Sequence, residues 1–151
     1  MRFHVASVLF VWFIGGQSCA RRSQPPIMEI TVERKGCLGP CPVYKLSLRK
    51  NSTSTYHGVK FVERIGQYSA KKSPAVDFDR ISRAVSDLRF FDLDNDYAAG
   101  WIDSERVIVT VVRPSESKTV RSFYFSKAPF ELWAVVTLAD GIAANLQWVK
   151  Q

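Results

Sequence analysis

Apolar and polar residues alternate with a period of two from residue 27 to residue 70. In 27–33 every second residue is apolar, and the alternation returns in 43–49 with Tyr44, Leu46 and Leu48 on one side. This period is typical of strands that are buried on one face. Residues 53–57 and a run within 59–70 continue it on either side of Gly58, where we expect the third strand to break. The first half therefore predicts a meander of short antiparallel strands.

At Ser73 and Pro74 the spacing of apolar residues changes to three and four. Serine followed by proline suits the N-cap and first position of a helix. The apolar residues that follow fall on one side of such a helix, and they are Phe78, Ile81, Val85 and Leu88. This spacing predicts an amphipathic helix, with Phe90-Phe91 extending its hydrophobic surface.

The second half combines strands with a second helix. The run 107–112 is β-branched throughout, which predicts a central strand covered on both faces, and 119–125 predicts its partner. Residues 129–148 predict another amphipathic helix, interrupted by Gly141. The expected fold class is α+β, an antiparallel β-meander sheet packed by two amphipathic helices in the order strands–helix–strands–helix. We expect residues 27–151 to form a single domain.

Residues 1–18 have the pattern of a signal peptide. Arg2 precedes a ten-residue, predominantly apolar run at 5–14, and 15–18 are small or polar. A spanning helix needs about 20 apolar residues, so this run predicts secretion and not a membrane anchor helix. Residues 16–19 resemble a bacterial lipobox, in which Cys19 is lipidated and becomes the new N-terminus. Ordinary cleavage after residues 18–20, a small-x-small triplet, is the alternative.

Cysteine arithmetic favours lipidation. If Cys19 carries lipid, Cys37 and Cys41 remain as an even pair, whereas otherwise an odd thiol is left in an oxidising compartment. Residues 19–26 then form a short polar tether between the membrane and the domain. The expected location is the cell envelope, with the domain lipid-anchored on the periplasmic or outer-membrane face in a Gram-negative host.

Composition and charge limit the kinds of partner that the domain is expected to bind. The chain of 151 residues is 46% hydrophobic and 23% charged, which suits one globular domain with a core. It has 21 Lys and Arg against 14 Asp and Glu, a formal net charge of +7. This balance favours an anionic envelope polymer as the partner of the domain, and a protein partner is the alternative. Export argues against nucleic acid.

The most distinctive stretch is 34–44, which matches R-x-x-C-x-G-x-C-P-x-Y. Its matching residues are Arg34, Cys37, Gly39, Cys41, Pro42 and Tyr44. The stretch resembles a family of small exported bacterial domains of unknown function, which also share an S-P-initiated helix ending in Phe-Phe. The resemblance runs from about residue 27 to the C-terminus. It implies the fold but no chemistry, because the family has no established activity.

Three roles are open for Cys37 and Cys41. Gly39 and Pro40 allow the chain to turn tightly enough to join the two sulfurs as a structural clip. A redox role is the second hypothesis, although C-x-x-x-C lacks the thioredoxin spacing. A metal or haem site is the weakest, because haem attachment needs C-x-x-C-H and His57 lies sixteen positions beyond Cys41.

An acidic segment superficially resembles a calcium loop. Its candidate ligands are Asp92, Asp94, Asp96 and Asp103. The sixth position of such a loop requires glycine for its sharp turn and is Tyr97 here, so we expect a solvated loop. His57 has no nucleophile elbow to serve, which favours an exposed strand residue.

The remaining chemistry points to binding and not to catalysis. Trp101, Trp133 and Trp148 could line a groove for a glycan or peptide, although a tryptophan on a helix is more often part of the core. We find no set of acid, base and nucleophile and expect no cofactor. The sequence therefore predicts an envelope lipoprotein that acts as a binding or accessory module. A small thiol-redox protein or envelope enzyme that uses Cys37 and Cys41 is the alternative.

Overall fold

The computed structural model describes residues 25–70, 75–97, 103–123 and 127–151. The elements in chain order are β1 (Glu29–Lys35), β2 (Val43–Arg49), β3 (Ser54–Lys60), β4 (Gly66–Ala70), α1 (Ala75–Asp87), the 3-10 helix η1 (Phe90–Asp92), β5 (Asp96–Tyr97), β6 (Arg106–Val112), β7 (Ser117–Phe123), α2 (Phe130–Asn145) and β8 (Trp148–Lys150). Within these ranges no helix is both long and apolar enough to cross a membrane. The predictions for 1–18 and Cys19 lie outside the described residues.

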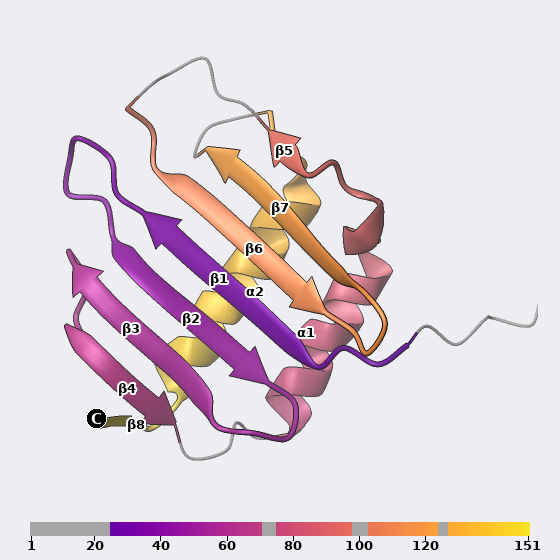
Figure 1. The fold of residues 1–151 in the computed structure, drawn as a ribbon, viewed down its shortest axis with the longest axis horizontal. Helices are drawn as coiled ribbons and strands as arrows, with labels where there is room; N and C mark the ends of the chain where they lie inside the picture. The colour runs from indigo at the N-terminus through magenta and orange to yellow at the C-terminus, as the bar shows by residue number, and fades with distance from the viewer. Residues whose placement is uncertain (1–24, 71–74, 98–102, 124–126) are drawn as a thin grey trace, which may run out of the picture.

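The described strands form one eight-stranded sheet in the order β5-β7-β6-β1-β2-β3-β4-β8. Neighbouring strands are antiparallel except β5 and β7, which run parallel. Both helices lie on the same side of the sheet (Figure 1). The predicted α+β class with a largely antiparallel sheet is confirmed, and the sheet has one covered face and one open face.

The core lies between the sheet and the two helices. The central strands β1, β2 and β6 contribute their alternate residues, and each helix contributes one side, as the two periods predict. The largest side chains with almost no exposure are Phe78, Phe90, Ile30, Leu46, Leu48, Ile81 and Leu132. Phe91 and Leu93 pack partly buried against this cluster, so the surface after α1 closes as the Phe-Phe pair indicates.

The predicted order of elements was wrong at two places. The short strand β5 precedes β6, and α2 ends at Asn145, after which Trp148–Lys150 pairs with β4 as β8. The Trp148 indole packs on Tyr56 at a centroid distance of 5.6 Å and donates to the Ala143 carbonyl at 2.8 Å. Pairing with β4 and the contacts of Trp148 favour a strand here over a longer α2. The pairing gives hydrogen-bond partners to backbone groups that the edge of β4 would otherwise expose to water.

The prediction that 107–112 is covered on both faces was wrong. In β6 only Val107, Val109 and Val111 are buried, and the residues between them are partly exposed. β6 lies inside the sheet between β7 and β1. The side chains of these neighbouring strands shield its open side, so a β-branched run does not require a second layer here.

Strand β3 does not break at Gly58 but continues to Lys60. A Cβ atom at this position would lie 1.7 Å from the Arg64 carbonyl oxygen. Glycine is required because the chain of the β3–β4 hairpin passes directly over the strand, and not because the strand ends.

We therefore expect Gly58→Ala to lower the free energy of unfolding by about 3 kcal/mol, at the upper end of overpacking effects. Gly141→Ala is the matched control, because nothing lies within 4 Å of a Cβ atom placed there and alanine favours a helix interior over glycine by about 1 kcal/mol. Urea denaturation of both variants measures the difference. A Gly58→Ala protein as stable as wild type contradicts the close approach.

Candidate functional site

Arg34 occupies a core position of β1. It lies on the same side of the strand as Ile30 and Val32, whose side chains are fully buried between the sheet and the helices. Its own side chain is 16% exposed. A guanidinium at such a position needs compensating acceptors, because an unpaired buried charge is strongly destabilising.

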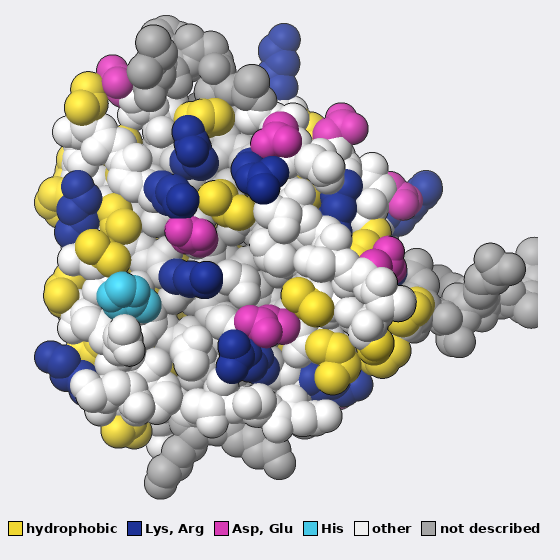
Figure 2. All heavy atoms as spheres, in the orientation of Figure 1, with side chains coloured by type: hydrophobic (Ala, Val, Ile, Leu, Met, Phe, Trp, Pro, Cys, Tyr) yellow, Lys and Arg dark blue, Asp and Glu magenta, His cyan; other side chains and the backbone are white. Residues whose placement is uncertain are grey.

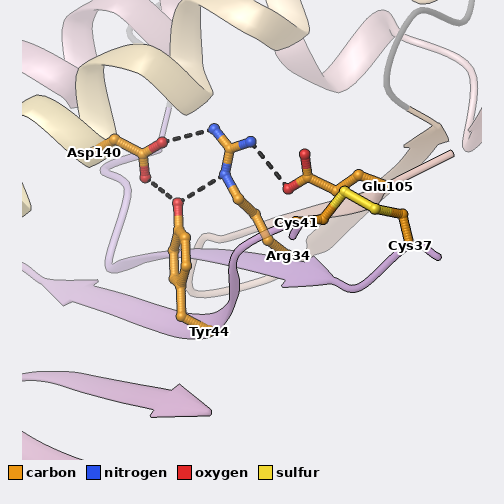
Figure 3. Close-up of polar contacts among 6 residues, drawn as sticks. All are labelled: Arg34, Cys37, Cys41, Tyr44, Glu105 and Asp140. Carbon is orange, nitrogen blue, oxygen red and sulfur yellow. Dashed lines mark hydrogen bonds and ion pairs between the residues drawn. A yellow bond between two sulfur atoms is a disulfide. The ribbon is translucent and has the colours of Figure 1, made fainter. Parts of the chain in front are cut away.

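Three groups from separate segments of the chain supply these acceptors. Nη1 of Arg34 donates to Glu105 at 3.1 Å and Nη2 donates to Asp140 at 2.8 Å, so the guanidinium forms ion pairs with both carboxylates. Nε donates to the hydroxyl of Tyr44 at 2.9 Å. Figure 3 shows the guanidinium between the two carboxylates, with the Tyr44 ring pointing to it from β2. Glu105 precedes β6 and Asp140 lies on α2, so the cluster joins sheet and helix.

The Tyr44 hydroxyl completes the cluster by donating a short hydrogen bond to Asp140. Burial raises the pKa of Tyr44, and the charge of Asp140 raises it further, outweighing Arg34. Burial alone would lower the pKa of Arg34, but Tyr44, Asp140 and Glu105 outweigh it and the pKa lies above its ordinary value. The phenol is therefore protonated and the guanidinium charged at neutral pH. We call Arg34, Tyr44, Glu105 and Asp140 the arginine cluster.

The raised pKa of Tyr44 predicts a specific loss of stability in alkali. Above about pH 10 an unfolded tyrosine loses its proton while the folded one keeps it, so stability present below that pH is lost as the pH rises. The free energy of unfolding of the wild type should fall more steeply above pH 10 than that of Tyr44→Phe. Denaturation of both proteins across this range measures the slopes. Parallel slopes contradict the assignment.

Cys37 and Cys41 form a disulfide beside this cluster, with their Cα atoms 5.7 Å apart. The backbone N–H of Gly39 donates to the Cys37 sulfur at 3.1 Å inside the loop. Closing so short a loop stabilises the fold by about 2 kcal/mol through the entropy of the unfolded chain. The predicted disulfide is confirmed, and the clip sets the course of the chain from β1 to β2.

A hollow of about 920 Å³ lies between this loop and α2. The disulfide, Pro40, Pro42, Trp133 and Val136 form its apolar walls, and Arg34, Asp103, Ser104, Glu105 and Thr137 supply its polar side. Its volume falls in the range of ligand pockets, about 300–1,000 Å³. We call this cavity the disulfide hollow. A second, smaller hollow lies on the other side of Arg34, towards Tyr44 and Trp148.

The motif residues therefore come together, whereas the other candidates do not. Gly39 lies inside the disulfide loop and Pro42 lines the hollow. His57 lies on the open face of the sheet and Tyr97 on the edge strand β5. Trp133 lines the disulfide hollow and Trp148 the second hollow, and Trp101 lies outside the described residues.

The structure does not gather the acidic candidates into a calcium loop. Asp92 pairs with Arg89 at 2.7 Å, Asp96 with Arg121 at 3.6 Å, and Asp103 lies at the disulfide hollow. Asp94 is exposed. In the parts of the chain that the structure describes, no group of three or more His, Cys, Asp or Glu side chains is placed to hold a metal ion.

Glu105 and Asp140 were missed as site residues. Two signals could have found them. Arg34 sits at a buried position of its alternating strand and so demands an acid, and Asp140 lies four residues after Val136 and three before Ala143, both buried on α2. An acid on the buried side of a helix and a base on the buried side of a strand are natural partners. Arg34 does not pair with the adjacent Glu33, which points to the open face and lies 3.6 Å from Lys35.

Fold and site together define a small α+β domain whose largely antiparallel sheet is covered by helices on one face. In it a disulfide loop and a partly buried arginine cluster border a ligand-sized hollow. The chain belongs to the family described as Domain of unknown function (DUF6438), which matches residues 28–143. No curated protein matches the chain. The resemblance to a domain of unknown function is confirmed, whereas the motif as a family signature and the lipoprotein signal stay predictions.

Proposed function

We propose that the protein is a non-catalytic binding module of the cell envelope, held to the membrane by lipid on Cys19, with the disulfide hollow as its ligand site. The observation that carries the proposal is the hollow itself. It lies where α2, the disulfide loop and the segment before β6 meet, and its volume of about 920 Å³ suits a small ligand or the end of a chain. The disulfide makes one wall rigid before a ligand binds, which limits the entropy lost on binding.

The arginine cluster supports a positioning role more than a catalytic one. Arg34 is held by three acceptors, and Tyr44 is held between Arg34 and Asp140. The raised pKa of Tyr44 keeps its proton in place, so the phenol does not serve as a base near neutral pH. The cluster instead fixes α2 against the sheet and thereby sets the shape of the hollow.

The chemistry of the hollow favours an amine that carries an apolar group. Arg34 is neutralised by Glu105 and Asp140, while the exposed Asp103 adds a further negative charge at the rim. Pro40, Pro42 and the disulfide offer apolar contact next to it. A cation attached to an apolar body satisfies both surfaces at once.

Three probes that share a phenylethyl group and differ in charge test this chemistry on the full chain. We expect 2-phenylethylamine to shift the backbone NMR signals of residues around the hollow, and 2-phenylethanol and 3-phenylpropionate to shift them little. Asp103→Asn should weaken amine binding about tenfold, which corresponds to the free energy of one charged hydrogen bond. Asp79→Asn, at an exposed position of α1, should leave amine binding unchanged. Equal binding of all three probes, or none, contradicts the proposal for the hollow.

The anchor is tested separately by labelling with radioactive palmitate in a bacterial host. Wild-type protein should incorporate label and Cys19→Ser should not. Lipidation of this residue also explains why the two remaining cysteines are paired. Absence of label on the wild type, or equal label on Cys19→Ser, would overturn the anchor but not the ligand site.

A thiol-redox function is the second candidate, and one observation favours it. Both Cys37 and Cys41 line the hollow and are partly exposed, so a thiol substrate could reach the disulfide. Thiol quantitation under denaturing conditions across a series of glutathione buffers separates the two functions. A structural clip stays oxidised throughout, whereas a redox pair titrates near the potential of the compartment.

A further inference from the structure

The sheet face that the helices leave open carries a row of hydroxyl side chains. Register places them side by side across six neighbouring strands from β7 to β4, and they are Thr119, Thr110, Thr31, Ser47, Thr55 and Ser69. Neighbouring strands lie about 4.8 Å apart, so the row extends about 24 Å. Each hydroxyl donates one hydrogen bond and accepts two. Thr31 and Ser47 bond to Glu29, and Thr110 bonds to Thr119. Ser47 is 4% exposed, so the exposed Thr55 at the groove offers the most capacity to an outside partner.

Basic residues flank this hydroxyl row. On the same face lie Lys35, Lys45, Arg49, Arg106 and Arg121, against the acids Glu29, Glu33 and Asp96, the last of which pairs with Arg121. Figure 2 shows Lys and Arg side chains gathered over the middle of this face, with single acidic side chains between them. Arg49 pairs with Glu29 and Lys35 with Glu33, but in the described residues Lys45 has no ion-pair partner. The face is therefore net positive.

The face is hollowed beside these charges. A groove of about 440 Å³ lies over β1 to β4, lined by hydroxyl, amide and charged side chains together with Tyr56 and Tyr68. Lys45 lies opposite His57, which lies opposite Gln67. On β2 the cations Lys45 and Arg49 lie on either side of Ser47, and β4 adds Gln67 and Ser69 to the lining.

We propose that this open face binds an extended anionic glycan of the cell envelope. Sugar hydroxyls pair with the Thr and Ser row, while carboxylate or phosphate groups of the polymer bind Lys45 and Arg49. The proposal goes beyond the ligand site of the disulfide hollow, because the two lie on opposite faces of the sheet. Each can fail without the other.

The lining of the face favours a glycan over its competitors. A protein partner usually buries an apolar centre, whereas this groove offers charged, hydroxyl and amide groups and, of aromatic side chains, Tyr56 and Tyr68. An anionic membrane needs only cations spread over a surface, and it leaves the hydroxyl row and the groove without a role. A hydroxylated polyanion uses the charges, the hydroxyls and the groove together.

Binding to polygalacturonate, a polymer of uronate sugars, tests the proposal with the full chain in detergent. We expect calorimetric binding to polygalacturonate and none to neutral dextran. Lys45→Gln with Arg49→Gln should weaken it at least tenfold, whereas Arg80→Gln with Arg83→Gln, which removes the same charge from exposed positions of α1, should leave it within twofold. Thermal unfolding checks that each variant is folded.

A second variant separates sugar recognition from charge alone. Thr55→Val keeps the shape and strand propensity of an exposed residue in the row but removes its hydroxyl. It should weaken polygalacturonate binding several-fold and leave binding of inorganic polyphosphate unchanged. Equal effects of the two double variants, an equal effect of Thr55→Val on both polymers, or binding only to phosphatidylglycerol vesicles would overturn the proposal.

Discussion

Replacing Arg34 by methionine is expected to lower the free energy of unfolding by about 3–4 kcal/mol. The change leaves the carboxylate of Glu105, whose side chain is 7% exposed, without its cation. Removing one partner of a buried ion pair costs about 3–5 kcal/mol, because the other charge remains desolvated. Asp140 is 33% exposed and regains contact with water, which places the expected loss in the lower part of that range. Chemical denaturation at pH 7 measures it.

Two further variants show whether the loss comes from the buried charge. Arg121→Met breaks an ion pair with Asp96 whose side chains are 51% and 67% exposed, and it should cost less than about 1 kcal/mol. Arg34→Met combined with Glu105→Gln should be more stable than Arg34→Met alone, because the orphaned charge is gone. If Arg34→Met costs no more than Arg121→Met, the arginine cluster does not hold α2 to the sheet.

Phe78→Ala is the second change with a large expected effect, a loss of about 3–5 kcal/mol in the free energy of unfolding. Phe78 on α1 is 2% exposed and packs in the core with Ile81 and Val85. Truncating it removes buried apolar surface and leaves a cavity that the sheet cannot close. Urea denaturation measures the loss.

Val76→Ala on the same helix is the matched control. Its side chain is 73% exposed, so the change should alter the free energy of unfolding by no more than about 0.5 kcal/mol. Comparable losses for Phe78→Ala and Val76→Ala would show that α1 is not held by the side that the apolar spacing selects.

Much of the fold follows from local patterns. The period of two placed β1 and β2 and their buried residues, and the spacing of Phe78, Ile81 and Val85 placed α1. These patterns succeed because each element buries one side, and the period of the burial is a property of the backbone. The end of α2 and strand β8 could not be predicted in this way, since Trp148–Lys150 becomes a strand only because the edge of β4 is there to pair with it.

The candidate site divides along the same line. The motif 34–44 is local. The sequence alone determined that it joins two strands through the tight Cys37–Cys41 loop. Only the tertiary structure decided that Glu105 and Asp140, 71 and 106 positions from Arg34, complete the cluster. It likewise decided that hydroxyls from six strands form one row. Contacts between distant segments depend on the order of strands in the sheet and on the face of the sheet that each helix covers. The local spacing of apolar residues determines neither of these.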